Sequence, residues 1–421
     1  MNRSPPDVVG ELLKQHPVTE REVYLDLENS APVPQEVVDE MLQFFTSEAY
    51  GNPTLTHKQG WAAYEEVMKA ADAVRRFLGA SSPEEVCFTT GEVEANNLAI
   101  LGAVGEFTRL STQGFCGRPA RQGGKIVISA VEPVSVMFPA EMLEKKGLKV
   151  VKVPVDGEGF LDTDGLSEAV DEETRLVSVG LVNNEVGAIQ PLREVVELVK
   201  DRNRDAIVHT DASDAYGRIR FDVKELGVDL ATLSSYKILG PRGVGVLYVK
   251  EGTKIERVIE GPIGTQALWP GVENTPLIVG FKKASELAFT DFDSNVEHMR
   301  RLRDHLIDGL LSMEDAILNG PRGKGRAPDN ANVSFLRCEG ESLTIELSLK
   351  GVYVSSGSAC TRKMLQPSHV LIALGREHEA AHGSILMKVS RYHSDEDVKY
   401  VVEAFGPALE RLRAIGPTAR G

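Results

Sequence analysis

This chain has few of the sequence features that mark membrane-spanning or secreted proteins. Aromatic residues make up only 6% of it, and no stretch approaches the 18 uninterrupted apolar residues of a membrane-spanning helix. The first residues, MNRSPPDVVGELLKQHP, include Pro5 and Pro6 and lack the apolar region of a secretory signal. We therefore expect a cytoplasmic protein with no membrane partner.

Cysteine is also scarce, and its four positions are far apart. Neither a zinc site nor a disulfide framework is indicated, because no CxxC pair is present. A single cysteine taken alone is most often a small buried hydrophobic residue. The four are Cys87, Cys116, Cys338 and Cys360.

Positive charge is in deficit, with 47 Lys and Arg against 62 Asp and Glu, which gives a formal net charge of −15. Nucleic-acid binding needs a basic surface to displace counterions from phosphates, so the balance argues against nucleic acid as the primary ligand. What is present is ordinary for a globular enzyme: 421 residues, 42% hydrophobic and 26% charged. That length fits two domains or one large α/β unit.

The middle of the chain alternates short β-rich runs with helical patterns. Most runs are apolar throughout rather than alternating, as in strands that are covered on both faces. Helices are predicted at 94–104 and at 191–203, the second with Pro191 at its start. These features predict a wound, mostly parallel α/β sheet. The seven candidate strands are residues 85–90, 125–130, 149–155, 176–182, 206–210, 228–234 and 243–249.

The pattern changes after about residue 280. A long amphipathic helix is predicted at 296–313, followed by short strands near 332–336 and 352–355 and a last helix at 395–414. This pattern predicts a second, smaller α+β domain. The segment 111–124 is rich in glycine and polar residues, which is typical of a surface insertion.

Three predicted strands end beside groups that together suit one ligand. Strand 85–90 leads through Gly91 into a helix whose first N–H groups suit a phosphate. Strand 206–210 leads into Asp211, and strand 228–234 leads to Lys237. Ligands bind at the carboxyl ends of such strands. Pyridoxal phosphate (PLP) needs a lysine for its Schiff base, a carboxylate for its pyridine nitrogen and a phosphate site, so we expect a PLP site here.

Longer strings extend this pattern from about Tyr24 to Tyr400. On these strings the chain resembles the cysteine desulfurases of the class V aminotransferase group, PLP enzymes of fold type I. The resemblance implies a seven-stranded large domain at 35–280 and a small domain formed by 1–34 with 281–421. The strings are YLD (24–26), GNP with His57, EANNLAI (94–100), NNEVG (183–187), HTDAS (209–213), SSYK (234–237), GPRGVG (240–245), VENTP (272–276), SSGSAC (355–360), PSHVL (367–371) and GSI with Arg391.

The resemblance assigns roles position by position. Lys237 corresponds to the lysine that holds the cofactor and moves protons, and Asp211 to the partner of the pyridine nitrogen. Asn184 corresponds to a residue that contacts the cofactor ring and the substrate, and Arg391 to the arginine that pairs with the substrate carboxylate. Cys360 corresponds to the nucleophile. The other positions that correspond to cofactor contacts are Gly91, Glu92, Val93, Pro133, Asp214, Ser234, Tyr236 and Val272.

Cys360 also has an interpretation from chemistry alone. A thiolate can take a sulfur atom and pass it to another thiol, and Cys360 lies in a stretch of small residues that can reach and retract. We therefore predict that L-cysteine is converted to L-alanine while Cys360 becomes a persulfide. A sulfur-acceptor or scaffold protein, in iron–sulfur cluster assembly or another pathway, would then take the sulfur.

Several of these positions differ from the family pattern. Pro133 stands in place of a ring-stacking histidine and cannot exchange a proton. Asp214 stands in place of a glutamine and would bring negative charge toward a phenolate oxygen. Each lost hydroxyl contact costs about 1 kcal/mol, so together the changes could weaken PLP binding by several tenfold steps. The remaining substitutions are Val93, Tyr236, Trp269, Val272 and Leu386.

These substitutions leave two alternatives beside the desulfurase. One is a selenocysteine lyase or another class V PLP enzyme. The other is a cofactor-poor paralogue that serves as a sulfur carrier or partner subunit. The resemblance also implies a homodimer, because active sites in this family borrow residues from the second subunit.

Overall fold

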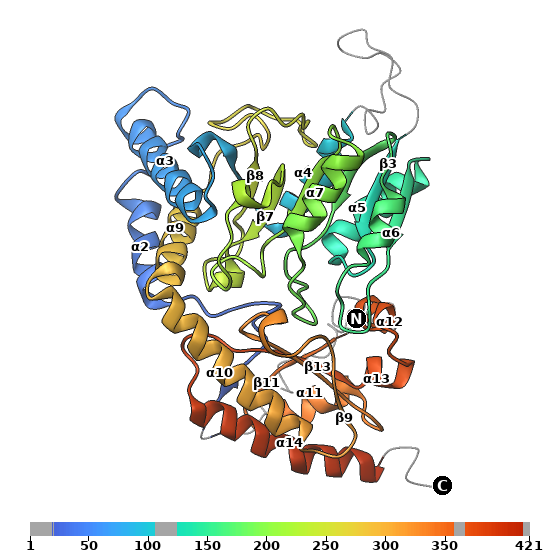
Figure 1. Ribbon diagram of the computed structural model, residues 1–421. Coiled ribbons are helices and arrows are strands. Elements are labelled where there is room, and N and C mark those ends of the chain that lie inside the picture. The colour runs from blue at the N-terminus through green and yellow to red at the C-terminus, as the bar shows by residue number, and fades with distance from the viewer. Residues whose placement is uncertain (1–18, 20, 106–123, 358–366, 416–421) are drawn as a thin grey trace, which may run out of the picture.

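The computed structural model describes residues 19, 21–105, 124–357 and 367–415 of the chain. Figure 1 shows a larger sheet with its helices in the upper half and a smaller sheet with two long helices, α10 and α14, in the lower half. Most of the predicted insertion at 111–124, and Cys360, lie outside the described residues. None of the helices in these ranges is both long and apolar enough to cross a membrane.

The larger sheet contains seven strands in the order β2-β8-β7-β6-β5-β3-β4. Strand β8 runs antiparallel to both of its neighbours, and the other neighbouring pairs are parallel. Each strand overlaps one of the seven predicted runs, so the mostly parallel α/β fold is confirmed. The strands are β2 (Val86–Thr89), β3 (Lys125–Ser129), β4 (Lys149–Val153), β5 (Thr174–Ser178), β6 (Ile207–Asp211), β7 (Leu230–Ser234) and β8 (Gly245–Val249).

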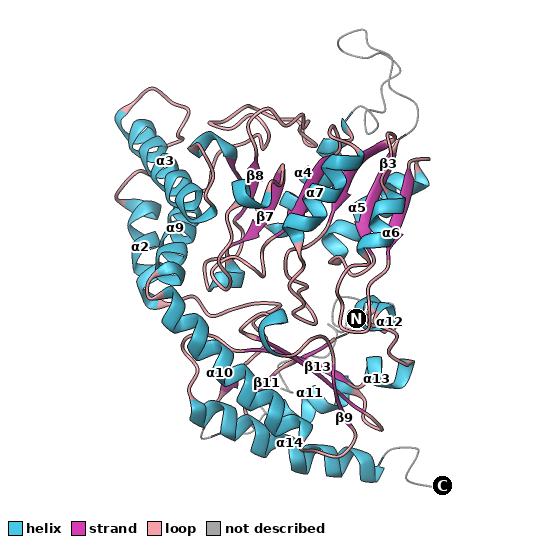
Figure 2. Cartoon of the chain, viewed as in Figure 1, coloured by secondary structure: helices cyan, strands magenta, loops and turns pink. Residues whose placement is uncertain are grey.

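Helices cover both faces of this sheet, which explains why most of its strands are mainly apolar (Figure 2). Ile126 and Ile128 of β3 pack with side chains of α4 and α5, whereas Val127 faces the core that contains α7. Helices α2 and α3 pack against α9. The helices are α2 (Gln35–Thr46), α3 (Lys58–Leu78), α4 (Glu92–Ala103), α5 (Val134–Lys145), α6 (Thr163–Ala169), α7 (Leu192–Arg202), α8 (Val223–Leu226) and α9 (Thr275–Phe289), with 3-10 turns η1 (Pro83–Glu85) and η3 (Tyr236–Ile238).

The smaller sheet has four antiparallel strands in the order β12-β13-β10-β9, and β1 (Val23–Tyr24) pairs in parallel with β11 (Val352–Tyr353). The predicted helices at 296–313 and 395–414 are present as α10 and α14. The short strands predicted near 332–336 and 352–355 are present as β10 and as β11 with the start of β12. Strands β1, β9 and β13 had not been predicted. The remaining elements are β9 (Ala316–Leu318), β10 (Asn330–Phe335), β12 (Ser355–Ser356), β13 (Ser384–Lys388), α10 (Phe292–Leu311), α11 (Gly340–Ser348), α12 (His369–Ala373), α13 (His378–His382), α14 (Asp395–Ile415) and η4 (Gly323–Gly325).

Two connections join the upper and lower halves. Helices α9 and α10 follow each other through Asp291, whose φ of 51° turns the chain from the large sheet toward the small one (Figure 1). The chain from β1, which pairs with β11 of the C-terminal part, to α2 is the other connection. The division into domains at residues 35 and 280 stays a prediction.

Candidate active site

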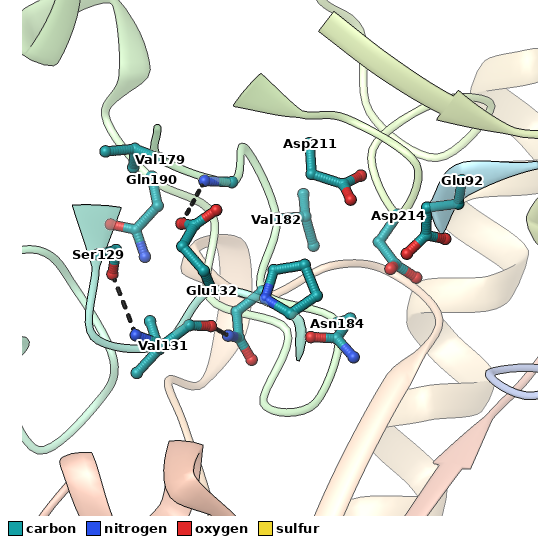
Figure 3. A pocket seen from close by; sticks show the side chains of 13 residues that line it. Glu92, Ser129, Val131, Glu132, Val179, Val182, Asn184, Gln190, Asp211 and Asp214 are labelled. Atoms are coloured by element: carbon teal, nitrogen blue, oxygen red, sulfur yellow. Dashed lines mark hydrogen bonds between the residues drawn. The ribbon is translucent and has the colours of Figure 1, made fainter. Parts of the chain in front are cut away.

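A pocket opens at the carboxyl edge of the large sheet, where the ends of β3, β5 and β6 meet. In Figure 3 the carboxyl groups of Glu92, Asp211 and Asp214 lie on one side of this pocket, and Glu132 with Gln190 lies on the other. This is the edge at which parallel α/β sheets bind ligands. The residues that line the pocket are Glu92, Ser129, Val131, Glu132, Pro133, Val179, Gly180, Val182, Asn183, Asn184, Gln190, Asp211 and Asp214.

Asp211 is the last residue of β6 and is held in one orientation. Its Oδ2 accepts a hydrogen bond of 2.7 Å from Asn96 Nδ2 of α4, and its Oδ1 accepts one of 2.9 Å from the Ser213 backbone N–H. Burial raises the pKa of this carboxyl, while the bonds from Asn96 and Ser213 oppose the rise. A fixed carboxylate at this point can pair with a protonated ring nitrogen.

Lys237 lies in η3, just after β7, and its side chain is 1% exposed. Its Nζ lies 2.5 Å from Glu28 Oε2 and 3.2 Å from Asp214 Oδ2. Burial by itself would lower the pKa of this ammonium, but the carboxylates of Asp214 and Glu28 outweigh burial and hold the pKa well above its ordinary value. Arg218, paired with Asp329, fixes the backbone here by donating to the Lys237 carbonyl at 2.6 Å.

A second buried lysine, Lys388 of β13, contacts the same two carboxylates. Its Nζ lies 2.6 Å from Glu28 Oε2 and is also bonded to Asp214 Oδ1. Asn184 Nδ2 donates to the other Glu28 oxygen at 2.9 Å. We call Glu28, Asp214, Lys237 and Lys388 the lysine–carboxylate cluster. Glu28 and Lys388 were not among the predicted site residues, although Glu28 follows the YLD string and Lys388 follows GSI.

The cluster changes the interpretation of Asp214. From the sequence, its carboxylate was expected to add an uncompensated negative charge near the cofactor. Burial would raise its pKa, but Lys237, Lys388 and Arg218 overcome that effect and hold the pKa below its ordinary value. The carboxylate is therefore ionised and paired with two ammonium groups.

The start of α4 offers a place for a phosphate. Gly91 precedes the helix without a side-chain cap, and the end of β2, the start of β8 and the end of β7 are in register at Thr89, Gly245 and Ser234. A Cβ on Gly245 would lie 2.7 Å from the Gly91 carbonyl carbon, so only glycine permits this approach. Ser234 Oγ is buried and has no hydrogen-bond partner among the described residues. Free helix N–H groups beside an unpaired hydroxyl fit a bound phosphate.

Taken together, these residues fit PLP. The lysine stands at the end of β7, the carboxylate at the end of the neighbouring strand β6, and the unpaired hydroxyl beside the start of α4. Glu92, also a predicted cofactor contact, lines the pocket beside Asp211. Burial first, and Asp211 second, raise its pKa well above the ordinary value, and its Oε2 has no partner among the described residues. In its neutral form this carboxyl can donate a hydrogen bond to an anionic ligand.

The other predicted positions fall into three groups: at the pocket or beside Lys237, exposed away from it, and in a neighbouring pocket. Pro133, at the start of α5, and Asn184 line the pocket, and the Tyr236 ring lies 5.6 Å from Lys237 Nζ. Val93 and Val272 are 57% and 66% exposed and are not among the residues that line it. Arg391 shares a neighbouring pocket with Lys237, but its guanidinium donates to the Tyr392 hydroxyl at 3.2 Å.

Two further buried carboxyls near the pocket titrate far from their usual range. Burial raises the pKa of Glu132 to about 8, against a hydrogen bond of 2.8 Å from the Gly180 N–H. Burial also raises the pKa of Glu185 to about 8, against a hydrogen bond of 2.7 Å from Ser368 Oγ. Both groups are therefore largely protonated at neutral pH.

This protonation predicts how stability depends on pH. Between about pH 5 and pH 8 the folded chain keeps protons that the unfolded chain has lost, so each group lowers the free energy of unfolding by about 1.4 kcal/mol per pH unit as pH rises. Glu185→Gln should remove one such contribution and flatten the curve, measured by urea unfolding across this range. Glu172→Gln, at an exposed position, should leave the slope unchanged. Parallel curves for wild type and Glu185→Gln would contradict the assignment.

Comparison with known proteins gives a consistent result. Residues 23–401 match the family described as Aminotransferase class-V. The chain is 40% identical over 397 residues to cysteine desulfurase IscS 1 of Archaeoglobus fulgidus, which covers 94% of this chain and 99% of the relative. A solved NifS-like protein superposes with a TM-score of 0.84 at 33% identity, covering 93% and 100% of the two chains. A structure titled SspA in complex with cysteine superposes with a TM-score of 0.74 at 27% identity, covering 89% and 100%.

Proposed function

Because the chain belongs to the class V aminotransferase family, we propose that it is a PLP-dependent cysteine desulfurase. It converts L-cysteine to L-alanine and transfers the sulfur to a protein thiol. The observation that carries this proposal is the placement of Lys237 and Asp211 at the ends of adjacent strands, with Asp211 lining the pocket and the start of α4 close by.

PLP, when bound, supplies an aldehyde for the lysine and a ring that withdraws electrons from the substrate. Lys237 would hold the cofactor and afterwards move the proton at the substrate Cα. Asp211, kept in place by Asn96 and Ser213, would hold the proton on the ring nitrogen. The first N–H groups of α4 and the Ser234 hydroxyl would bind the phosphate.

The sulfur step is assigned to Cys360. Its sulfur attacks Sγ of L-cysteine, an S–S bond forms, and the Cβ–Sγ bond breaks. The electron pair of the broken bond remains on the substrate side, where a proton completes the methyl group of alanine. Arg391 would pair with the substrate carboxylate through guanidinium N–H groups other than the one that donates to the Tyr392 hydroxyl.

The proposed partners are a second copy of the chain and a sulfur-acceptor or scaffold protein. Large apolar side chains around α2 and α3 are exposed to solvent, and a monomer seldom exposes large apolar patches, so this surface supports a homodimer. Val272, which corresponds to a residue that reaches the partner's phosphate site, is also exposed. The exposed side chains around α2 and α3 are Leu42, Phe45, Tyr50, Leu55, Trp61 and Tyr64.

The proposal is tested by adding PLP and L-cysteine to the purified protein. We expect a visible absorbance band from lysine-bound PLP, at one equivalent per chain, and L-alanine formation once a thiol acceptor is supplied. L-Selenocysteine serves as the comparison substrate, and alanine formed from it far faster than from L-cysteine would favour a selenocysteine lyase. A protein that stays colourless with added PLP, and carries persulfide only when an active desulfurase is supplied, would contradict the proposal and favour a sulfur carrier.

A further inference from the structure

The lysine–carboxylate cluster brings together four charged side chains that are nearly removed from solvent. The exposed fractions are 1% for Lys237, 2% for Lys388, 7% for Asp214 and 13% for Glu28. Each of the two carboxylates contacts both ammonium groups, so the four groups form a closed ring of ion pairs. With both lysines protonated and both acids ionised, the cluster has no net charge.

The proposed reaction changes the net charge of this cluster. An ammonium group has no free electron pair, so Lys237 must lose a proton to solvent before its amine can attack the PLP aldehyde. The nitrogen then bonds the aldehyde carbon, and the aldehyde oxygen leaves as water. Without a second cation, the loss of that proton would leave two ionised carboxylates in a buried site, which is unfavourable.

The other charged and titratable groups around Lys237 do not take the place of a cation bonded to both carboxylates. Arg218 favours the ionised form of Asp214 from nearby, but its guanidinium is paired with Asp329 and donates to the Lys237 backbone carbonyl. Arg391 lines a pocket with Lys237, but its guanidinium donates to the Tyr392 hydroxyl. Tyr236 and Glu92 face Lys237 as neutral groups or anions. Within the described residues, Lys388 is the other cation bonded to both Glu28 and Asp214.

We propose that Lys388 is a positioning residue. When Lys237 gives up its proton to react with the cofactor, the Lys388 ammonium keeps Glu28 and Asp214 in place and compensates their negative charge. Lys388 comes from β13 of the smaller sheet, so the C-terminal part of the chain sets the reactivity of a lysine on the large sheet. The Lys388 ammonium also compensates the negative charge of Asp214, which would otherwise repel the phenolate oxygen of the cofactor. This inference rests on the proposed function, because it assumes that Lys237 reacts with PLP.

The test follows PLP loading of cofactor-free protein. The growth of the visible band is timed across a pH series for wild type, Lys388→Met, Asp214→Asn and the double variant. Removing the Lys388 charge should move the midpoint of the rate profile up by at least about one pH unit, so that loading at a fixed lower pH is at least about tenfold slower. Asp214→Asn should move the midpoint down, and the double variant should return near wild type. Lys388→Arg, which keeps the charge, should retain most of the wild-type profile.

A matched control separates this role from the loss of any buried ion pair. Lys125, at the opposite end of β3 from the pocket, is also a buried lysine, with its Nζ 2.5 Å from Asp171 Oδ2. Lys125→Met should lower the urea midpoint but leave the pH profile in place. If Lys388→Met does not fold, the double variant, which keeps the charge balanced, should still give a higher pH midpoint for PLP loading than Asp214→Asn.

The outcomes distinguish the two proposals. A wild-type protein that gains no visible band at any pH would overturn both the proposed function and this inference. A normal band in wild type, with an unmoved profile in Lys388→Met or with equal midpoints for Asp214→Asn and the double variant, would overturn this inference alone. A shift for Lys388→Met in the same direction as for Asp214→Asn would also overturn it.

Discussion

Lys237→Ala is expected to abolish both the visible band of bound PLP and L-alanine production from L-cysteine. The variant removes the amine that attaches the cofactor and the group that moves the Cα proton. Proton transfer alone is worth about 10²- to 10⁴-fold in rate, so the combined loss should exceed about a thousandfold. Absorbance spectroscopy measures the first effect, and quantification of L-alanine measures the second.

Lys237→Arg provides the matched control for charge. The guanidinium can preserve the ion pairs with Glu28 and Asp214, yet it stays protonated and cannot attach the cofactor. We therefore expect an inactive, colourless protein that unfolds at nearly the wild-type urea concentration. Substantial alanine formation by either variant would show that another amine performs the chemistry, and Lys388 would be the first to examine because it shares both carboxylates.

Cys360→Ser is expected to abolish persulfide formation and sulfur transfer while the visible band remains. A hydroxyl oxygen is a far weaker nucleophile than a thiolate at neutral pH and cannot carry sulfur as a persulfide. Mass spectrometry of the protein after brief exposure to L-cysteine should show an added sulfur atom in wild type and none in the variant. A persulfide located on Cys360 would also confirm that the segment around it, which lies outside the described residues, reaches the substrate.

Two buried cysteines serve as controls for that experiment. Burial raises the pKa of Cys87, within β2, to about 12 and the pKa of Cys338 to about 11. At neutral pH both therefore remain thiols, which are poor nucleophiles. Cys87→Ala and Cys338→Ala should leave the yield of persulfide unchanged. A loss of persulfide in either of them, with Cys360 intact, would contradict the assignment of the nucleophile.

The large sheet could be predicted because its evidence is local. Apolar runs such as 125–130 indicate strands that are covered on both faces, and the side chains just after them lie at one edge of the sheet. This reasoning identified Lys237 and Asp211, and the structure brings both to that edge. The two-residue strand β1 was not predicted, because a pair that short has no periodicity of its own and depends on tertiary packing.

The cluster around Lys237 could not be predicted in the same way. Glu28 and Lys388 are 360 residues apart, and Asp214 is 174 residues from Lys388. Nothing in the strings that contain them shows that their side chains meet, so Asp214 was interpreted as an unpaired charge. A lysine within an otherwise apolar run, SILMKV, was the one local signal, since such a charge needs a partner when it is buried.

The sequence by itself determined the class of fold and the family, and it pointed to Lys237 and Asp211 as candidates to hold PLP, because each of these depends on short strings and on the order of strands. The tertiary structure decided the electrostatic state of the site. Whether a buried carboxylate opposes or supports the chemistry depends on which cations lie within hydrogen-bonding distance. One of those cations, Lys388, is supplied here by β13 of the smaller sheet, from the far end of the chain.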